Sequence, residues 1–132
     1  MFTLWTLNLT NSVASLATNL STATTALTLT SSTINGPGTI TNAAGQTLTL
    51  HYGTIGAASA LDNQGLVVVN GTSAINNALT TTSGSTLRLQ PDGSTRFSTL
   101  TVANGFTNLG AIELTSTVST YSSALTATAG TL

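Results

Sequence analysis

Hydrophobic and polar residues alternate in short segments along this chain. The clearest segments are pairs of large aliphatic side chains separated by one residue, as in Leu-Thr-Leu at 27–29 and again at 48–50. Alternation with a period of two is typical of a strand that buries one of its faces. Six such pairs serve as anchors of a repeat, and each predicts one strand: Leu7/Leu9, Leu27/Leu29, Leu48/Leu50, Leu66/Val68, Leu87/Leu89 and Ile112/Leu114.

The six pairs recur at a nearly constant interval. Their first members are separated by 20, 21, 18, 21 and 25 residues. Thirteen residues beyond each first member stands another leucine or isoleucine, at Leu20, Ile40, Leu61, Leu79, Leu100 and Leu125. A period of this length is typical of repeat proteins in which each repeat stacks on its neighbours.

The pattern therefore predicts an all-β protein, a single-stranded parallel β-helix (β-solenoid) of about six coils of 18–25 residues. The coils start near residues 7, 27, 48, 66, 87 and 112, within one domain spanning residues 1–132. The first members of the pairs and the residues thirteen positions later form its core ladder. A third side, with less regular spacing, takes Val13, Ile34, Ile55, Ile75, Phe97 and Val118.

The constant thirteen-residue interval implies that differences in coil length fall in the turn that closes each coil. The longest of these turns covers residues 101–111. We interpret it as an insertion that protrudes from the coil. Its residues Asn104, Phe106 and Asn108 are then candidates for a contact loop.

Two polar pairs follow from the same register. Asn42 and Asn63 each lie two residues past a core position in successive coils, which predicts an amide ladder along the stack. Arg88 and Glu113 each follow the first member of a pair by one residue, so both face outward on adjacent coils. We expect them to form an exposed ion pair.

The amino-acid composition limits the kinds of partner and of binding site that the chain can have. Charged residues make up 4% of the chain, the formal net charge is −1, and there is no cysteine. This charge pattern argues against nucleic acid as a partner, and the lack of cysteine removes disulfides and thiolate metal sites. No apolar run is long enough for a membrane-spanning helix. Threonine, serine, asparagine and glycine dominate the remaining positions, as expected for strands and turns.

Parallel β-helices also host enzymes, so the positions of the acidic residues bear on catalysis. The three carboxylates, Asp62, Asp92 and Glu113, fall on different sides of the predicted coil. A pair of catalytic carboxylates must instead face one another on one side. His51 has no second histidine or cysteine near it to complete a metal site. We therefore expect no enzyme activity, no metal and no cofactor.

Several segments resemble the β-helical repeats of large secreted bacterial proteins. GTITNAAGQTLTL, ALDNQGLVVVNGT, ALTTTSGSTLRL and GFTNLGAIELTS are similar to repeats in the passenger regions of autotransporter and filamentous-haemagglutinin-type adhesins. The resemblance covers roughly residues 26 to 132. It implies a right-handed parallel β-helix, located outside the cell or on its surface, that serves as a stalk, adhesin or matrix component.

The ends of the predicted coil stack bear most directly on function. A new pair begins at Leu132, and neither end shows an obvious polar or helical cap. Open strand edges favour pairing with further strands. We therefore expect a structural protein that stacks end to end with copies of itself into a filament, or that forms part of a surface stalk. The alternative is an adhesin module that binds cell-surface glycans through residues 101–111.

Ice binding is a further alternative, because outward threonines flank the residues thirteen positions after each coil start. A flat face of stacked threonines would order water through hydroxyl and methyl groups. The threonines concerned are Thr39, Thr41, Thr80, Thr99, Thr101 and Thr126.

Overall fold

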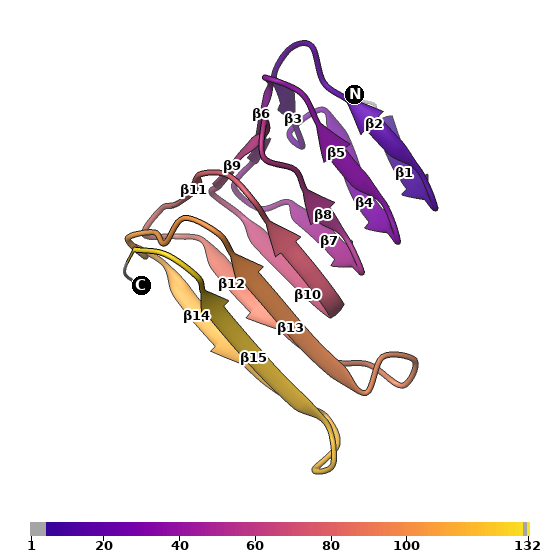
Figure 1. Cartoon of the computed structure of the whole chain (residues 1–132), viewed down its shortest axis with the longest axis vertical. Coiled ribbons are helices and arrows are strands. Elements are labelled where there is room, and N and C mark those ends of the chain that lie inside the picture. The colour runs from indigo at the N-terminus through magenta and orange to yellow at the C-terminus, as the bar shows by residue number, and fades with distance from the viewer. Residues whose placement is uncertain (1–4, 131) are drawn as a thin grey trace.

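The computed structural model describes residues 5–130 and 132, and its regular elements there are all β-strands. The chain winds into a parallel β-helix whose coils stack along one axis (Figure 1). Every strand pairs in parallel with its equivalent in a neighbouring coil. The predicted fold class is therefore confirmed.

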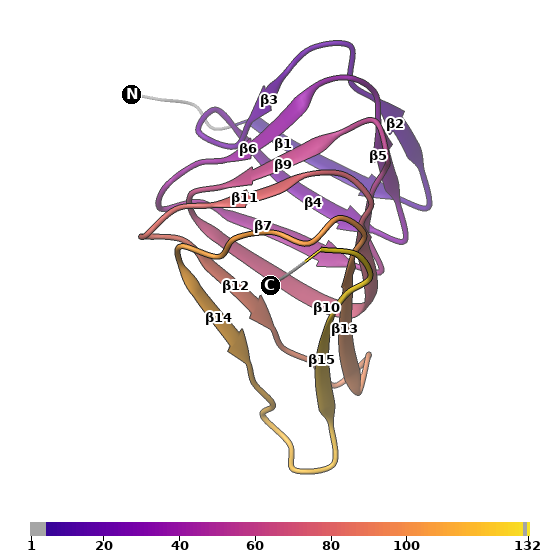
Figure 2. The same ribbon diagram turned by 60° about the vertical axis from the view of Figure 1, so that its left-hand side comes forward.

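Each coil has up to three strands, which define three faces called A, B and C below (Figure 2). Face A contains β1 (Trp5–Thr10), β4 (Thr25–Thr30), β7 (Thr47–His51), the first half of β10 (Leu66–Ile75), β12 (Thr86–Leu89) and β14 (Ala111–Leu114). Face B contains β2 (Val13–Ser15), β5 (Thr33–Asn35), β8 (Thr54–Ile55), the second half of β10, β13 (Phe97–Val102) and β15 (Ser122–Ala127). Face C contains β3 (Leu20–Ser21), β6 (Thr39–Asn42), β9 (Ala60–Asn63) and β11 (Leu79–Thr81).

The core lies inside the coil, where alternate residues of each strand point inward and stack on their equivalents. On face A, Leu27, Leu48 and Leu87 are at most 1% exposed. On face C, Ile40 and Leu61 are buried in the same way and pair with each other. Removing these aliphatic side chains from water is the main force that holds the coils together.

The predicted register is wrong by one residue in the fourth coil. Val67, not Leu66, pairs with Leu48 and Leu87, and Val67 and Val69 are completely buried. Leu66 and Val68 therefore point outward. The run Leu-Val-Val-Val has no polar residue to show which alternate set faces the core, so periodicity alone could not choose between them.

Leu100 and Leu125 also lie on a different face from the one predicted. They pair with each other on face B, and Leu100 pairs with Ser73 there. The corner between faces A and B is longer in the last two coils, at residues 90–96 and 115–121. Both long corners protrude from the stack in Figure 1. Because these corners take up residues, a count of thirteen reaches only the second face.

Residues 101–111 are not a protruding insertion. The first two end β13, the last begins β14, and the segment between them forms the third side of the fifth coil. Phe106 is only 6% exposed and belongs to the hydrophobic core. The predicted insertion is therefore an ordinary coil side, and the extra length of this coil lies at its A–B corner.

Face B also differs from the prediction in which of its residues point inward. Val13 is 74% exposed, whereas its neighbour Ala14 pairs with the buried Ile34. Phe97 is likewise exposed, and Val102 takes the inward position in that coil.

The corner between faces A and B turns through residues with left-handed backbone. Asn11, Ser31, Tyr52 and Gly71 have φ angles of 49°, 48°, 55° and 65° in the first four coils. A serine follows this corner in the first two coils. The Ser32 hydroxyl accepts a hydrogen bond from the Ser12 amide at 3.0 Å and donates one to the Thr30 carbonyl at 2.7 Å. These bonds satisfy backbone groups that the sharp turn removes from the strand ladder.

The corrected register of the fourth coil predicts opposite effects for two adjacent valines. Val67→Ala should lower the free energy of unfolding by about 1–3 kcal/mol, because it empties a fully buried position. Val68→Ala on the outward side should change the free energy of unfolding by less than about 0.5 kcal/mol. Urea denaturation of both variants measures the difference. The reverse ranking would favour the register with Leu66 and Val68 inside.

Candidate functional site

The three carboxylates lie on different sides of the coil, as the sequence predicted. Asp62 is on face C, Glu113 is on face A, and Asp92 lies in the corner loop 90–96. Among the described residues, no group of three or more histidine, cysteine, aspartate or glutamate side chains could hold a metal ion.

Asp92 organises the corner loop of the fifth coil. Its carboxylate accepts hydrogen bonds from the Ser94 hydroxyl at 2.6 Å, the Ser94 amide at 2.8 Å and the Thr95 amide at 2.9 Å. The Ser94 hydroxyl makes the largest contribution to lowering the pKa of Asp92 to about 2, against a smaller upward effect of desolvation. The ionised carboxylate therefore holds the loop in shape.

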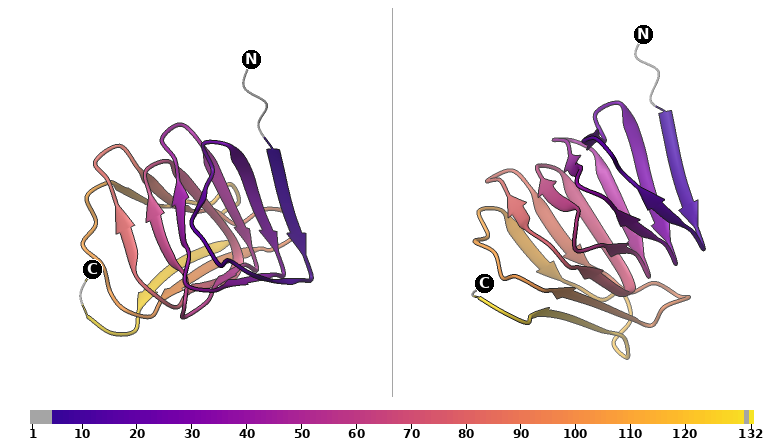
Figure 3. Two further views of the ribbon diagram at one scale, coloured as in Figure 1. Left: turned by 90° about the horizontal axis from the view of Figure 1, so that it is seen from above. Right: turned by 45° about the horizontal axis from the view of Figure 1, so that its top comes forward.

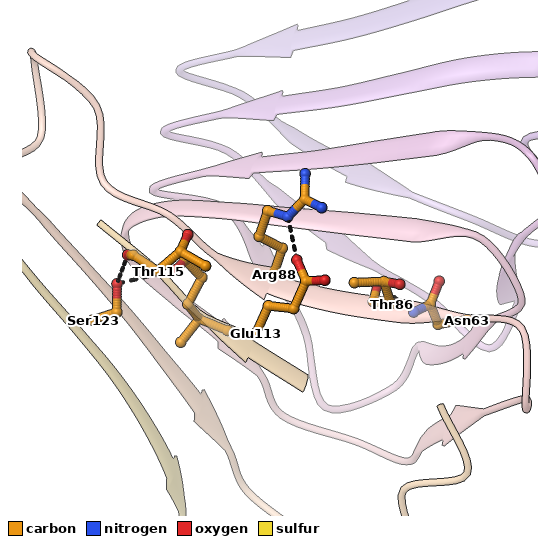
Figure 4. Close-up of polar contacts among 7 residues, drawn as sticks. Asn63, Thr86, Arg88, Glu113, Thr115 and Ser123 are labelled. Carbon is orange, nitrogen blue, oxygen red and sulfur yellow. Dashed lines mark hydrogen bonds and ion pairs between the residues drawn. The ribbon is translucent and has the colours of Figure 1, made fainter. Parts of the chain in front are cut away.

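The predicted ion pair between Arg88 and Glu113 is present. Arg88 Nε and Glu113 Oε2 are 2.6 Å apart on adjacent strands of face A (Figure 4). Both side chains are a little over one third exposed. An exposed pair of this kind contributes at most about 1 kcal/mol, so its role is to support the register of two strands.

The predicted amide ladder of Asn42 and Asn63 is also present, and both residues are completely buried. Asn42 Nδ2 donates a hydrogen bond to Asn63 Oδ1 at 2.9 Å. The same amide group donates to the Leu66 carbonyl, and Asn63 Nδ2 donates to the Thr86 carbonyl. Figure 4 shows the Asn63 amide beside Thr86. The ladder thus ties face C of one coil to the face A strand that lies two coils further along the chain.

The ladder is longer than the two asparagines. In the first coil, the Thr22 hydroxyl donates to Asn42 Oδ1 at 3.1 Å. At the other end, the Thr81 hydroxyl donates to Asn108 Oδ1 at 3.1 Å. Threonine and asparagine share this column because each supplies a short polar group that can bond along the stack. Thr81 pairs with Asn63 in the strand register.

The predicted contact loop is therefore partly internal. Phe106 belongs to the core, and Asn108 is partly buried and accepts a hydrogen bond from the Thr81 hydroxyl. Of the three candidate residues, only Asn104 is exposed. Of the predicted contact residues, this placement leaves Asn104 at the surface, and a glycan contact through residues 101–111 stays a prediction.

The candidate ice-binding threonines do not form one surface. Thr39, Thr41 and Thr80 lie on face C, whereas Thr99, Thr101 and Thr126 lie on face B. The column on face C is broken further by Asp62, which pairs with both Thr41 and Thr80. A flat threonine array of the predicted composition therefore does not exist on either face.

Both ends of the coil stack expose strand edges and parts of the inward columns (Figure 3). Leu89 is completely buried, but Leu114, which continues its column in the last coil, is 50% exposed. At the other end Leu7 and Leu9 are only partly buried, whereas Leu27 and Leu29, which pair with them, are completely buried. Trp5, Val13 and Leu132 add further exposed apolar surface at the two ends.

Comparison of the chain with protein-family models, with curated proteins and with solved structures found no match in any of the three. Within the described part of the chain, no helix is long and apolar enough to cross a membrane.

Removing one member of the amide ladder should lower the free energy of unfolding substantially. Asn63→Ala removes one of the two acceptors of the Asn42 side-chain amide and the side-chain partner of the Gly65 amide and of the Thr86 carbonyl. Because buried polar groups lose about 1–3 kcal/mol each when left unpaired, the free energy of unfolding should fall by at least about 2 kcal/mol. Thr41→Ala, an outward position one strand away, is the matched control and should cost less than about 0.5 kcal/mol.

The loop around Asp92 should depend on acid pH. A lowered pKa means that the carboxylate stabilises the folded loop above about pH 4, and that this contribution is lost as pH falls through about 2. The amide resonances of Ser94 and Thr95 should therefore titrate with a midpoint near 2 in an NMR pH series, and Asp92→Asn should abolish the transition. A midpoint at the ordinary aspartate value of 3.8 would contradict this assignment.

Proposed function

We propose that this chain is a structural β-solenoid that stacks end to end with copies of itself into an extracellular filament, or forms part of a surface stalk. The proposal rests on the two ends of the coil stack in the described part of the chain. There, inward-facing apolar columns are exposed beside strand edges that have no further strand to pair with. Leu114 at one end and Leu9 at the other belong to the same column.

The same register supports a specific way of joining two copies. If the β14 edge of one copy pairs in parallel with β1 of the next, Ile112 stacks on Leu7 and Leu114 stacks on Leu9. Both contacts repeat those made between coils within the chain. Pairing of this kind buries apolar surface and satisfies edge amides and carbonyls at the same time.

Low charge favours such assembly. With a formal net charge of −1, two copies meet little electrostatic repulsion. Self-association through open edges is then limited mainly by the entropy of joining two molecules.

The filament form of the proposal is tested at Leu114. Purified protein should form rods by electron microscopy, and its mass in light scattering should rise with concentration. Leu114→Lys should lower the rod yield at least about tenfold, since it places a charge in the joint where burial would be costly. Because Leu114 is already half exposed, the variant should fold normally.

Thr49→Lys on the lateral surface of face A is the matched control and should assemble like the unmodified protein. Only dispersed monomers of the unmodified protein at high concentration would contradict the filament form. The stalk form of the proposal would then remain. In that form, further coils of the same polypeptide cover the strand edges.

A further inference from the structure

At one corner of the fold, the backbone conformation disfavours the type of residue that occupies it. Tyr52 has φ 55° at the A–B corner of the third coil. The equivalent positions in neighbouring coils hold Asn11, Ser31 and Gly71. Glycine and asparagine tolerate left-handed backbone, whereas a bulky side chain there is an outlier. The turn itself therefore does not require tyrosine.

The ring of Tyr52 lies across the next coil. A Cβ atom added at Gly71 would lie 2.7 Å from the ring, so only glycine leaves room for it there. Beyond Gly71 the ring meets Phe97 of the fifth coil, with ring centroids 6.3 Å apart and planes at 83°. On its own coil it meets His51, with centroids 5.0 Å apart and planes at 79°.

These three rings form a patch on the side of the stack, here called the aromatic corner (His51, Tyr52 and Phe97). Tyr52 and Phe97 are 37% and 38% exposed although they contact each other. Because neighbouring rings stand nearly perpendicular, the patch is angular rather than flat. In this arrangement a ligand can stack on the face of one ring and contact a second ring from the side.

Polar residues adjoin the aromatic corner in the strand register and along the chain. Asn70 lies next to His51 in the strand register and donates a hydrogen bond to the Gln90 carbonyl at 2.8 Å. The loop 90–96, held in shape by Asp92, leads directly into Phe97. Arg96, with φ 57°, precedes Phe97 and is exposed. One cation and one anion in this loop leave the neighbourhood without net charge.

We propose that the aromatic corner binds a neutral glycan by stacking a pyranose ring against Tyr52 and Phe97. Aromatic rings with a few fixed polar groups are the usual lining of a small-ligand site, and they suit the apolar face and polar rim of a sugar. The balanced charge gives no attraction for a polyanion. Two partly exposed rings also fall far short of the roughly 800 Å² per partner that a stable protein interface buries.

The site lies on the side of the coil stack and not at its ends. It therefore does not rest on end-to-end assembly, and a failure of the filament experiment would leave it standing. A rod built from such coils would present one aromatic corner per copy along its length. Weak binding at each site would then add up through multivalency.

The test uses saturation-transfer NMR and affinity electrophoresis of the full chain. The probes are chitotetraose, cellotetraose and maltotetraose with their parent polysaccharides, and heparin serves as the anionic comparison. At least one neutral probe should bind, and heparin should not. Phe97→Ala should weaken binding at least about tenfold, because the loss of one stacking ring is large for a small ligand.

Tyr52→Asn is the decisive variant, because asparagine suits the left-handed corner and still removes the ring. It should keep or raise the melting temperature while weakening binding at least about tenfold. Tyr121→Ser, at an aromatic residue outside the corner, is the control and should bind like the unmodified protein.

Three results would overturn the proposal. The first is no binding of any neutral probe, and the second is unchanged binding by Tyr52→Asn. The third is a loss of lateral association between copies in the two corner variants, with no effect on any sugar, which would assign the corner to a second copy of the chain.

Discussion

Parallel pairing in register between successive coils is the constraint on which the rest of this structure depends. Once Leu29 lies on Leu9, and Leu50 on Leu29, the same inward column continues through Val69 and Leu89. Each column must hold side chains that pack on their own kind, because equivalent residues stand about 4.8 Å apart along the stack. Aliphatic columns bury apolar surface, and the few polar columns must bond along the axis.

The corners of the coils place the strictest requirements on backbone hydrogen bonding. A chain that turns sharply leaves amides and carbonyls outside the strand ladder, and those that are buried need partners. Between faces C and A the amides of Asn42 and Asn63 supply them by bonding to the Leu66 and Thr86 carbonyls. Between faces A and B the Ser12 amide bonds to the Ser32 hydroxyl. The A–B corner also takes up the extra length of the fifth coil, so the columns on either side remain aligned.

The ends and the sides of the stack offer different surfaces. The ends expose apolar columns and strand edges, which suit contacts with further coils. The sides are mostly threonine and other small polar residues, with the aromatic corner as a local exception. Under the two proposals above, extension of a rod and recognition of a ligand would use separate residues.

Sequence alone determined the repeat, the fold class, the amide ladder and the Arg88–Glu113 pair, because alternation and spacing are local and the stack repeats them. Counting residues along the sequence could not tell which alternate set of residues faces inward, nor on which side of the coil a residue lies. The tertiary structure decided both. In the run from Leu66 to Val69 both alternate sets are apolar, and only packing against Leu48 and Leu87 selects Val67. Leu100 and Phe106 were misplaced because the corner at 90–96 is longer than its equivalents, which no hydrophobic pattern records. The contact of Tyr52 with Phe97 joins residues of two coils that are not neighbours, so it depends on the stacking itself and on the space left at Gly71.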